Sequence, residues 1–321
     1  MSVHCMRFVG IAIIMIFIAG CAPAASTQTP PTASLPTPPP TAEPPPAPTL
    51  TASPAPSVTA SIVATSTAAV SATSVITERV KLDDITMYYA AYGTGKPLIL
   101  LHGGSSSADE FQRQVPWFAQ HYRVITPDSR GQGRTTDSDA PLSYHLMAED
   151  MVRLMDYLKL DSAYIVGWSD GGIIGLDMAM HHPERVAALV AYGANTSPDG
   201  VKPENVAFFR TAKPEVLQAA MGAEYLRLSS TPEHLPAIVE KMRTMFLTDP
   251  NFTAADLASI KSPTLILDGE EEEFVRIDHV KEFAQTIPGA ELILMPGIGH
   301  FAPEERAAEF NKIVLDFLKD K

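Results

Sequence analysis

The sequence predicts an α/β fold in which helices cover both faces of a mostly parallel β-sheet. Two observations lead to this prediction. Over residues 78–321, short apolar runs typical of buried strands alternate with amphipathic helical patterns. One purely helical stretch, residues 195–259, interrupts that alternation, which indicates a helical insertion within the α/β domain. This part of the chain is also long enough to bury one substantial core, so we expect a single domain.

The composition excludes several classes of function. The 321 residues include 24 Lys and Arg against 37 Asp and Glu, a formal net charge of −13. This acid excess argues against a nucleic-acid partner, because a phosphate backbone is bound by clustered basic residues. Two cysteines form neither a disulfide framework nor a Cys-rich metal site. Residues 1–77 contain only Arg7 and Glu43 as charged residues, so the net charge belongs to residues 78–321.

The first 20 residues have the pattern of an export signal. Arg7 precedes an apolar run, residues 8–18, that is shorter than the ~20 residues of a membrane span. An uncleaved membrane anchor is the alternative. The end of the run, Ile18-Ala19-Gly20-Cys21, resembles the lipobox of bacterial lipoproteins. That resemblance implies cleavage before Cys21 and lipidation of this cysteine. We therefore expect an exported protein, lipid-anchored to the extracytoplasmic face of a bacterial envelope membrane.

Residues 21–77 are expected to be the lipidated cysteine followed by a disordered tether. Pro, Thr, Ala and Ser dominate there, and such a composition does not build an apolar core. Runs such as Pro38-Pro39-Pro40 favour extended polyproline II, at ~3.1 Å per residue. The tether would hold the domain away from the membrane. A role of the proline runs as a ligand is the alternative.

The strands and helices of residues 78–321 follow from hydrophobic periodicity. Strands are predicted at residues 85–92, 97–101, 122–126, 163–166, 186–192, 264–267 and 291–295. Apolar residues recur at helical spacing over residues 147–158 and again over residues 310–318. Pro303, followed by two glutamates, suits the first turn of the last helix.

Residues 195–259 are predicted to form a helical cap over one end of the sheet. We expect it to act as a lid that shapes a substrate pocket. A decoration without catalytic consequence is the alternative. Its expected apolar contacts are Phe208, Phe209, Met221, Leu226, Met242, Met245 and Phe246.

A candidate nucleophile lies between a strand and a helix, in Gly167-Trp168-Ser169-Asp170-Gly171-Gly172. A tight strand-to-helix turn strains the serine backbone and exposes its hydroxyl, while the flanking glycines let the turn close. The helix N-terminus behind it favours developing negative charge. The alternative is a glycine-rich turn with an ordinary serine.

A serine nucleophile needs an oxyanion site and a base. The loop Leu101-His102-Gly103-Gly104 follows an earlier strand, so we assign the oxyanion hole to the N–H groups of Gly104 and Asp170. We expect His102 to be structural, because it precedes the loop glycines. His300 lies just past a late strand in a glycine-bracketed loop and is the predicted base.

The remaining histidines give no metal pattern. His181 and His182 end a helix and are expected at the surface, and no histidine spacing suggests a metal site. The third member of the site should be a carboxylate from the acidic loop at residues 268–275, which would orient His300. Because clustered carboxylates repel, we expect one working acid in this loop and at least one that keeps its proton or turns to solvent.

Taken in order, these motifs resemble the α/β-hydrolase superfamily over essentially all of residues 78–321. Asp128 and the glycines after it match a turn that is usually structural in these enzymes. A narrower resemblance is to the biphenyl-hydrolase-like group that includes valacyclovir hydrolase. It rests on residues 167–172, Tyr192-Gly-Ala-Asn195, Glu309-Phe-Asn-Lys312 and Asp316-Phe-Leu318. Members of that group cleave esters, notably α-amino-acid esters.

The resemblance also implies roles for two acidic residues. In that group the triad acid, an Asp, lies three residues after a glycine, which corresponds to Glu272 when counted from Gly269. Glu270 and Glu273 stay as alternatives, and Asp199 is a more distant one. The Asp that matches Asp170 contacts the substrate's amino group in the group. The alternative is a side chain bonded within its own turn.

The expected function is therefore hydrolysis of small-molecule carboxylic esters by a Ser169–His300–Glu272 triad through an acyl-enzyme, with no cofactor and no metal. Lactone opening, carbon–carbon bond cleavage and aminopeptidase activity on the same triad are the nearest alternatives, with perhydrolysis as a side activity. An alternative of another class is a tethered small-molecule receptor that hardly turns over its ligand.

Overall fold

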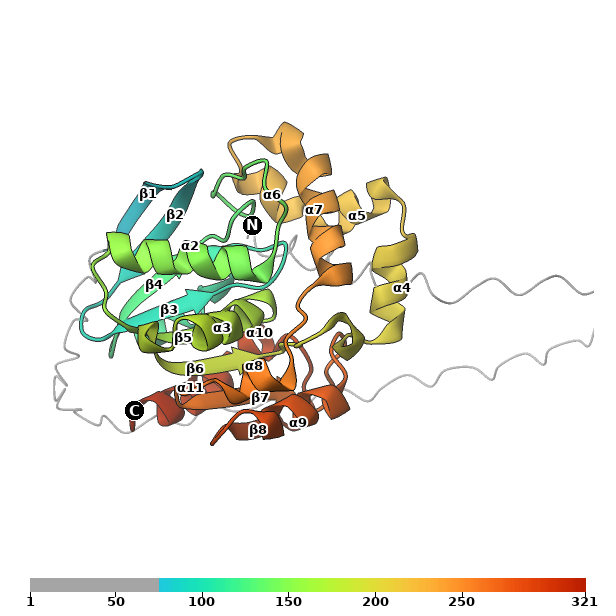
Figure 1. Ribbon diagram of the computed structural model, residues 1–321. Helices are drawn as coiled ribbons and strands as arrows, with labels where there is room; N and C mark the ends of the chain where they lie inside the picture. The colour runs from blue at the N-terminus through green and yellow to red at the C-terminus, as the bar shows by residue number, and fades with distance from the viewer. Residues whose placement is uncertain (1–74) are drawn as a thin grey trace, which may run out of the picture. The chain divides into compact units, whose positions relative to one another are not determined.

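The computed structural model describes residues 75–321. An eight-stranded sheet has the order β1-β2-β4-β3-β5-β6-β7-β8 (Figure 1). The pairs β1–β2 and β2–β4 are antiparallel, and the strands from β4 to β8 are parallel to one another. The strands are β1 (Ile76–Leu82), β2 (Ile85–Tyr92), β3 (Pro97–Leu101), β4 (Arg123–Pro127), β5 (Ala163–Trp168), β6 (Val186–Tyr192), β7 (Thr264–Gly269) and β8 (Glu291–Met295).

Helices cover both faces of the sheet, as an α/β fold requires. Alternate residues of β3 show the two layers: Ile99 and Leu101 belong to one apolar core, and Leu98 and Leu100 belong to the other. The first core includes α2 (Tyr144–Tyr157), α3 (Asp170–His181) and α9 (Ile277–Thr286). The second includes α1 (Val115–Phe118) and α11 (Ala307–Leu318). Both faces are therefore buried, which explains the continuous apolar runs of the central strands.

Five helices lie between β6 and β7: α4 (Pro203–Thr211), α5 (Pro214–Met221), α6 (Ala223–Leu228), α7 (Leu235–Thr248) and α8 (Ala254–Ala258). Helices α4 to α7 lie to one side of the sheet in Figure 1, whereas α8 packs back against α3 and α9. Of its expected apolar contacts, Met221, Met242 and Met245 are buried. Leu226 was expected inside but is 54% exposed, because it lies on the outer side of a short helix.

Two further predictions need correction. The sheet begins with β1 at Ile76, a strand that the apolar pattern missed, so Ile76 and Thr77 belong to the sheet rather than to the tether. Pro303 opens a separate short helix, α10 (Ala302–Glu305), and not α11. The backbone leaves the helical region at Arg306, whose guanidinium donates to the carbonyls of Pro296 and Gly297, both at 2.7 Å.

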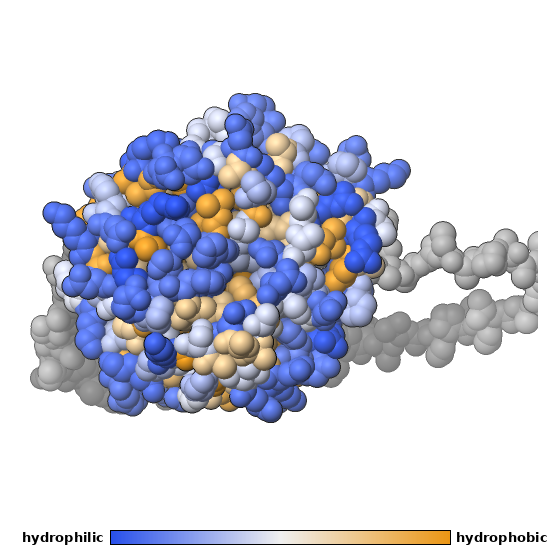
Figure 2. Space-filling view, in the orientation of Figure 1, coloured by the Kyte–Doolittle hydropathy of each residue, from blue (hydrophilic) through white to orange (hydrophobic). Residues whose placement is uncertain are grey.

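The face shown in Figure 2 is mostly hydrophilic, with apolar residues scattered among polar ones. Over residues 75–321, no helix combines the length and the apolarity that a membrane crossing needs. The expected signal peptide, Cys21 and the tether up to residue 74 lie outside the described residues.

Candidate active site

Ser169 occupies a strained turn between β5 and α3. Its backbone has φ 55° and ψ −118°, in a region that residues with a side chain rarely adopt, and its N–H donates to the Tyr192 carbonyl at 2.7 Å. The flanking glycines are required by close approach. A Cβ at Gly167 would collide with the Gly171 backbone, and a Cβ at Gly171 would collide with the carbonyl of Leu101. The sequence motif is thus explained by packing, and the turn leaves Ser169 partly exposed.

Two backbone N–H groups beside Ser169 are free to bind an anion. Asp170 is the first residue of α3, so its N–H has no partner within the helix. The N–H of Gly103 donates to Glu110 Oε2 at 2.8 Å, whereas that of Gly104 has no partner within residues 75–321. The two residues are in contact, since a Cβ at Gly104 would be 2.6 Å from Asp170 Oδ2. These are the two residues that the sequence assigned to the oxyanion hole.

His300 follows β8 and is 6% exposed. Its Nδ1 lies 2.8 Å from Glu272 Oε2. Packing fixes the ring: it lies 4.8 Å from the Phe274 ring, centroid to centroid, and a Cβ at Gly193 would be 2.7 Å from its Cε1 atom. These contacts hold the His300 ring in one orientation, whereas a histidine in an open loop would rotate freely.

Glu272 is the member of the acidic loop that contacts the histidine ring. Its other oxygen, Oε1, accepts the N–H groups of Phe274 and Val275 at 2.7 and 3.2 Å, which directs Oε2 toward the ring. Glu273 instead accepts the backbone N–H of His300 at 2.7 Å. The two acids that precede them in the chain, Glu270 and Glu271, are exposed. Of the alternatives weighed for the triad acid, neither Glu270 nor Asp199 has a side-chain contact with His300.

Burial and charge set the protonation of this group. Burial alone would lower the pKa of His300, but the neighbouring Glu272 carboxylate outweighs it, so the pKa lies above the usual value. Burial would raise the pKa of Glu272, yet its contact with His300 holds it below the ordinary value. Burial and the Glu272 charge raise the pKa of Asp268 well above its usual range. One acid of the cluster thus contacts His300, while the charged form of a neighbouring acid is disfavoured.

The serine and the histidine come from neighbouring segments, although they are not hydrogen-bonded. Ser169 Oγ makes no hydrogen bond within residues 75–321. Tyr192 accepts the N–H of Ser169, and the next residue, Gly193, packs against the His300 ring. Hydrogen bonds of this kind are often long in free enzymes and tighten when substrate binds.

The other polar residues of the predicted motifs are held in structural contacts. His102 Nδ1 donates to the carbonyl of Gly103 at 2.7 Å, and its Nε2 accepts the N–H of Ser129 at 2.9 Å. Burial lowers the pKa of His102, so the ring is neutral and has no nitrogen left to act as a base. Asp128 accepts the N–H groups of Ala108 and Arg134, both at 2.7 Å, which ties two loops together.

Asp170 has an unusual carboxyl group. It is 6% exposed; Oδ1 accepts the hydroxyl of Tyr144 at 3.0 Å, and Oδ2 is buried without a partner among the described residues. Burial raises the pKa of Asp170 to about 7. The side chain is therefore bonded to α2 and not within its own turn. Phe246 of the cap also approaches this point, because a Cβ at Gly104 would be 2.9 Å from its ring.

Sequence reasoning missed Glu110, which contacts the loop that contains Gly103 and Gly104. Its carboxylate accepts the N–H of Gly103, and burial raises its pKa to about 7. It lies in a short 3₁₀ helix, Ala108–Phe111, where no motif marks it. A small cavity between this loop and the cap is lined mainly by apolar side chains, among them Met221, Leu235, Ile238, Val239 and Met242.

Comparison with known proteins identifies the family. A family model described as alpha/beta hydrolase fold matches residues 96–255. The human serine hydrolase BPHL is 31% identical over 259 residues, which cover 76% of this chain and 87% of that protein. The chain belongs to the α/β-hydrolase family. Its mostly parallel sheet is that of this family, and its class of activity is that of a hydrolase.

Two further members of the α/β-hydrolase family show how varied the reactions are. A 2-hydroxy-6-oxo-6-phenylhexa-2,4-dienoate hydrolase from Burkholderia cepacia is 29% identical over 260 residues, covering 70% of this chain and 88% of that enzyme. The structure of Est816, described as an N-acyl homoserine lactone degrading enzyme, matches with a TM-score of 0.62 and 31% identity, covering 75% of this chain and 100% of that one. The protein is thus a hydrolase, and the relatives differ too much in substrate for membership of the family to identify its own.

Proposed function

We propose that the protein is a serine esterase that cleaves small carboxylic esters through an acyl-enzyme. The observation that carries the proposal is the 2.8 Å contact between His300 Nδ1 and Glu272 Oε2, in a domain whose strained Ser169 turn lies beside two free N–H donors. A binding protein has no need of all these features together, which argues against the tethered receptor.

In the proposed mechanism His300 Nε2 takes the proton of Ser169 as its Oγ attacks the ester carbonyl. The N–H groups of Gly104 and Asp170 bind the tetrahedral oxyanion, and each such donor contributes about 3–4 kcal/mol to the transition state. Glu272 stabilises the imidazolium, which then gives its proton to the leaving alcohol. Water, deprotonated by His300, attacks the acyl-enzyme; the acid leaves and Ser169 regains its proton. These steps use no cofactor.

Lactone opening is the second candidate, and the 31% identity to Est816 favours it. The chemistry is the same, except that the leaving alcohol stays attached to the acyl group. Carbon–carbon cleavage, suggested by the Burkholderia relative, differs because the leaving group is a carbon that must be protonated. Aminopeptidase activity needs a free amine at the substrate's N-terminus and an amide to cleave.

A substrate panel with one variant tests these alternatives. Purified protein is assayed on p-nitrophenyl acetate, an N-acyl homoserine lactone, an amino-acid p-nitroanilide and a 2-hydroxy-6-oxo-dienoate, beside Ser169→Ala. We expect the highest kcat/KM on the ester, fluorophosphonate labelling of the wild type, and loss of both in the variant. Retained esterase activity in Ser169→Ala, or an unlabelled wild type, would exclude the proposal.

We also propose that Asp170 binds the ammonium group of α-amino esters. Its buried Oδ2 has no partner among the described residues. An ammonium group would donate the missing hydrogen bond and would place a positive charge opposite the carboxylate. Asp170→Ala is compared with the wild type on valine and on isovaleryl p-nitrophenyl esters, which differ only in the amino group. A selective rise in KM for the amino ester is expected. An equal loss on both esters would refute this role.

We propose, further, that Cys21 anchors the protein to a bacterial envelope membrane through lipid, as its lipobox-like sequence suggests. The full chain and a Cys21→Ser variant are expressed with labelled palmitate and partitioned into detergent. Label and detergent partitioning should both disappear in the variant; label retained without Cys21 would refute the anchor.

A further inference from the structure

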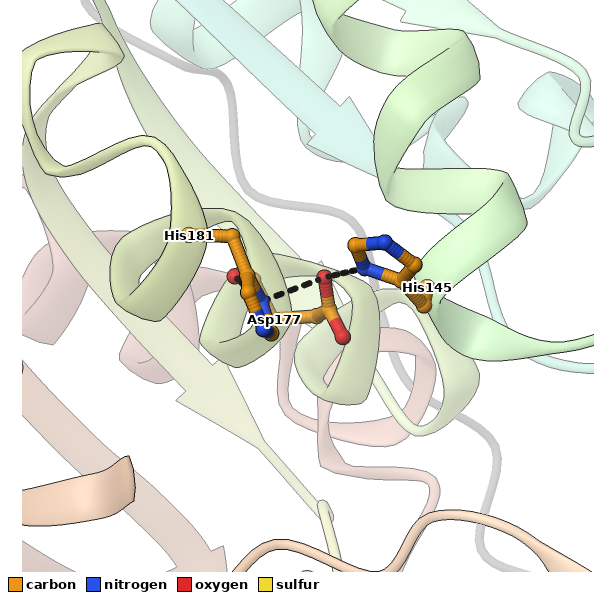
Figure 3. Close-up of side chains that lie close together, drawn as sticks. All are labelled: His145, Asp177 and His181. Atoms are coloured by element: carbon orange, nitrogen blue, oxygen red, sulfur yellow. Dashed lines mark hydrogen bonds and ion pairs between the residues drawn. The ribbon is translucent and has the colours of Figure 1, made fainter. Parts of the chain in front are cut away.

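Three side chains of metal-ligating types meet on the surface where α2 packs against α3 (Figure 3). His145 comes from the first turn of α2, and Asp177 and His181 come from the second half of α3. The Asp177 side chain is 2% exposed, while those of His145 and His181 are about half exposed. A buried carboxylate is thus covered by two imidazoles that solvent can reach.

We propose that His145, Asp177 and His181 form a binding site for one divalent transition-metal ion, with Zn²⁺ as the best fit. Two imidazole nitrogens and a carboxylate oxygen are a common zinc-ligand set, and water would fill the fourth position. The inference is independent of the proposed esterase function.

The distances agree with this ligand set. Asp177 Oδ1 lies 2.9 Å from His145 Nδ1 and 3.1 Å from His181 Nδ1. Ligand atoms held ~2.0–2.1 Å from Zn²⁺ are separated by about 3–3.4 Å at near-tetrahedral angles. The three ligand atoms all lie within 4.8 Å of one another, so side-chain rotation alone brings them around one ion. Asp177 and His181 are four residues apart on one helix, which keeps them on the same face.

Charge also favours a cation here. Among the described residues, Asp177 has ion-pair contacts only with these two histidines and none with Lys or Arg. Three more carboxylates interact electrostatically with the cluster: Glu149 and Asp249 with His145, and Asp256 with His181. Of the nearby basic groups, His182 pairs with Glu149 at 2.6 Å, and the positive charge of Arg153 helps to lower the pKa of the same glutamate. A dication would neutralise a local excess of negative charge.

The sequence predicted no metal site, and the fold explains why these three residues do not form a recognisable sequence motif. His145 and Asp177 are 32 residues apart, and only the packing of α2 on α3 brings them together. The same packing reaches the active site, because Tyr144, beside His145, donates to Asp170. An ion bound here would therefore fasten together two helices that carry residues of the candidate active site.

The test uses the full-length protein, Zn²⁺ alone as the probe, and two readouts that do not depend on activity. Isothermal titration at pH 7.5 should give one equivalent of Zn²⁺ bound, and zinc at about 100 times its dissociation constant should raise the melting temperature by roughly 5–10 °C. His145→Ala and His181→Ala should each weaken binding more than about tenfold and abolish the thermal shift. Both side chains are about half exposed, so both variants should fold, which a melting curve without zinc checks.

His182→Ala is the matched control, because His182 is the next residue along the chain and pairs with Glu149 instead. It should bind zinc like the wild type. All other imidazole and thiol groups of the chain remain in the three variants and so cannot explain a difference between them. No binding by the wild type, or equal binding by His145→Ala, would overturn the proposal and leave two hydrogen-bonded histidines on a carboxylate.

Discussion

Replacing Glu272 with Gln should lower kcat/KM for an ester about 10⁴-fold without unfolding the protein. Oε1 of Glu272 accepts the N–H groups of Phe274 and Val275. In the variant the amide oxygen must keep these two donors, so the NH₂ group takes the place of Oε2 opposite His300 Nδ1. An NH₂ group only donates hydrogen bonds, so Nδ1 must accept and the ring proton moves to Nε2.

A ring protonated on Nε2 does not accept the proton of Ser169. The base is lost although every heavy atom keeps its place, and four decades in rate correspond to about 5.5 kcal/mol of transition-state stabilisation. The backbone contacts of Glu272 are retained, so the free energy of unfolding should change much less than this.

Glu273→Gln is the matched control, one residue further along the same loop. Within residues 75–321 the Glu273 carboxylate accepts only the backbone N–H of His300, and an amide oxygen also accepts that bond, so the loss of kcat/KM in this variant should stay below roughly tenfold. Both variants are assayed on p-nitrophenyl acetate near pH 8 and melted by circular dichroism. The reasoning is refuted if folded Glu272→Gln keeps more than a tenth of wild-type kcat/KM, or if Glu273→Gln loses as much.

Three more predictions concern the same site. Gly193→Ala should reduce kcat about 100-fold by pushing on His300. Gly289 has a similar positive φ, but a Cβ there would meet no atom of residues 75–321 within 4 Å, so Gly289→Ala should cost stability alone; kinetics and melting curves separate the two variants. Because Glu272 raises the pKa of His300, the acid limb of kcat/KM on a simple ester should lie above the ordinary histidine value of about 6.5; a limb below it contradicts this. Because the pKa of Asp170 is about 7, KM for an α-amino ester should fall as the carboxyl ionises from pH 6 toward 7.5, while KM for the matched simple ester stays level.

Hydrophobic patterning predicted the central strands well, because these strands are buried on both faces and read as continuous apolar runs. It missed β1 (Ile76–Leu82), where only Val80 and Leu82 are buried. An edge strand with one partner has little apolar signal. The break before α11 was also invisible, because it depends on the contacts of Arg306 with a loop about ten residues upstream.

For the site, a local motif was enough to predict the turn at Ser169, because the backbone packing of this turn admits only glycine on either side. The Gly167–Ser169–Gly171 spacing follows from a turn that no side chain at the glycines would allow. The acid that contacts His300 was indicated only by the family resemblance, because the residues alone left several candidates. Glu272 and His300 are 28 residues apart, and the acidic loop offered several candidates of equal charge. Only the fold shows which carboxylate has its other oxygen already bound to backbone.

The position of β1 has a mechanical consequence. In the part of the chain that the structure describes, β1 is an edge strand paired only with β2, whereas Ser169, Glu272 and His300 follow β5, β7 and β8 on the other side of the sheet. We expect a pulling force on the N-terminal side of residue 76 to peel β1 from β2 first and leave the parallel strands intact. In a single-molecule pulling experiment, the first extension should then release this strand while esterase activity persists; activity lost at that first step would contradict it. When the protein is pulled from its N-terminal side, the sheet would therefore open first at β1, a strand that carries no residue of the candidate active site.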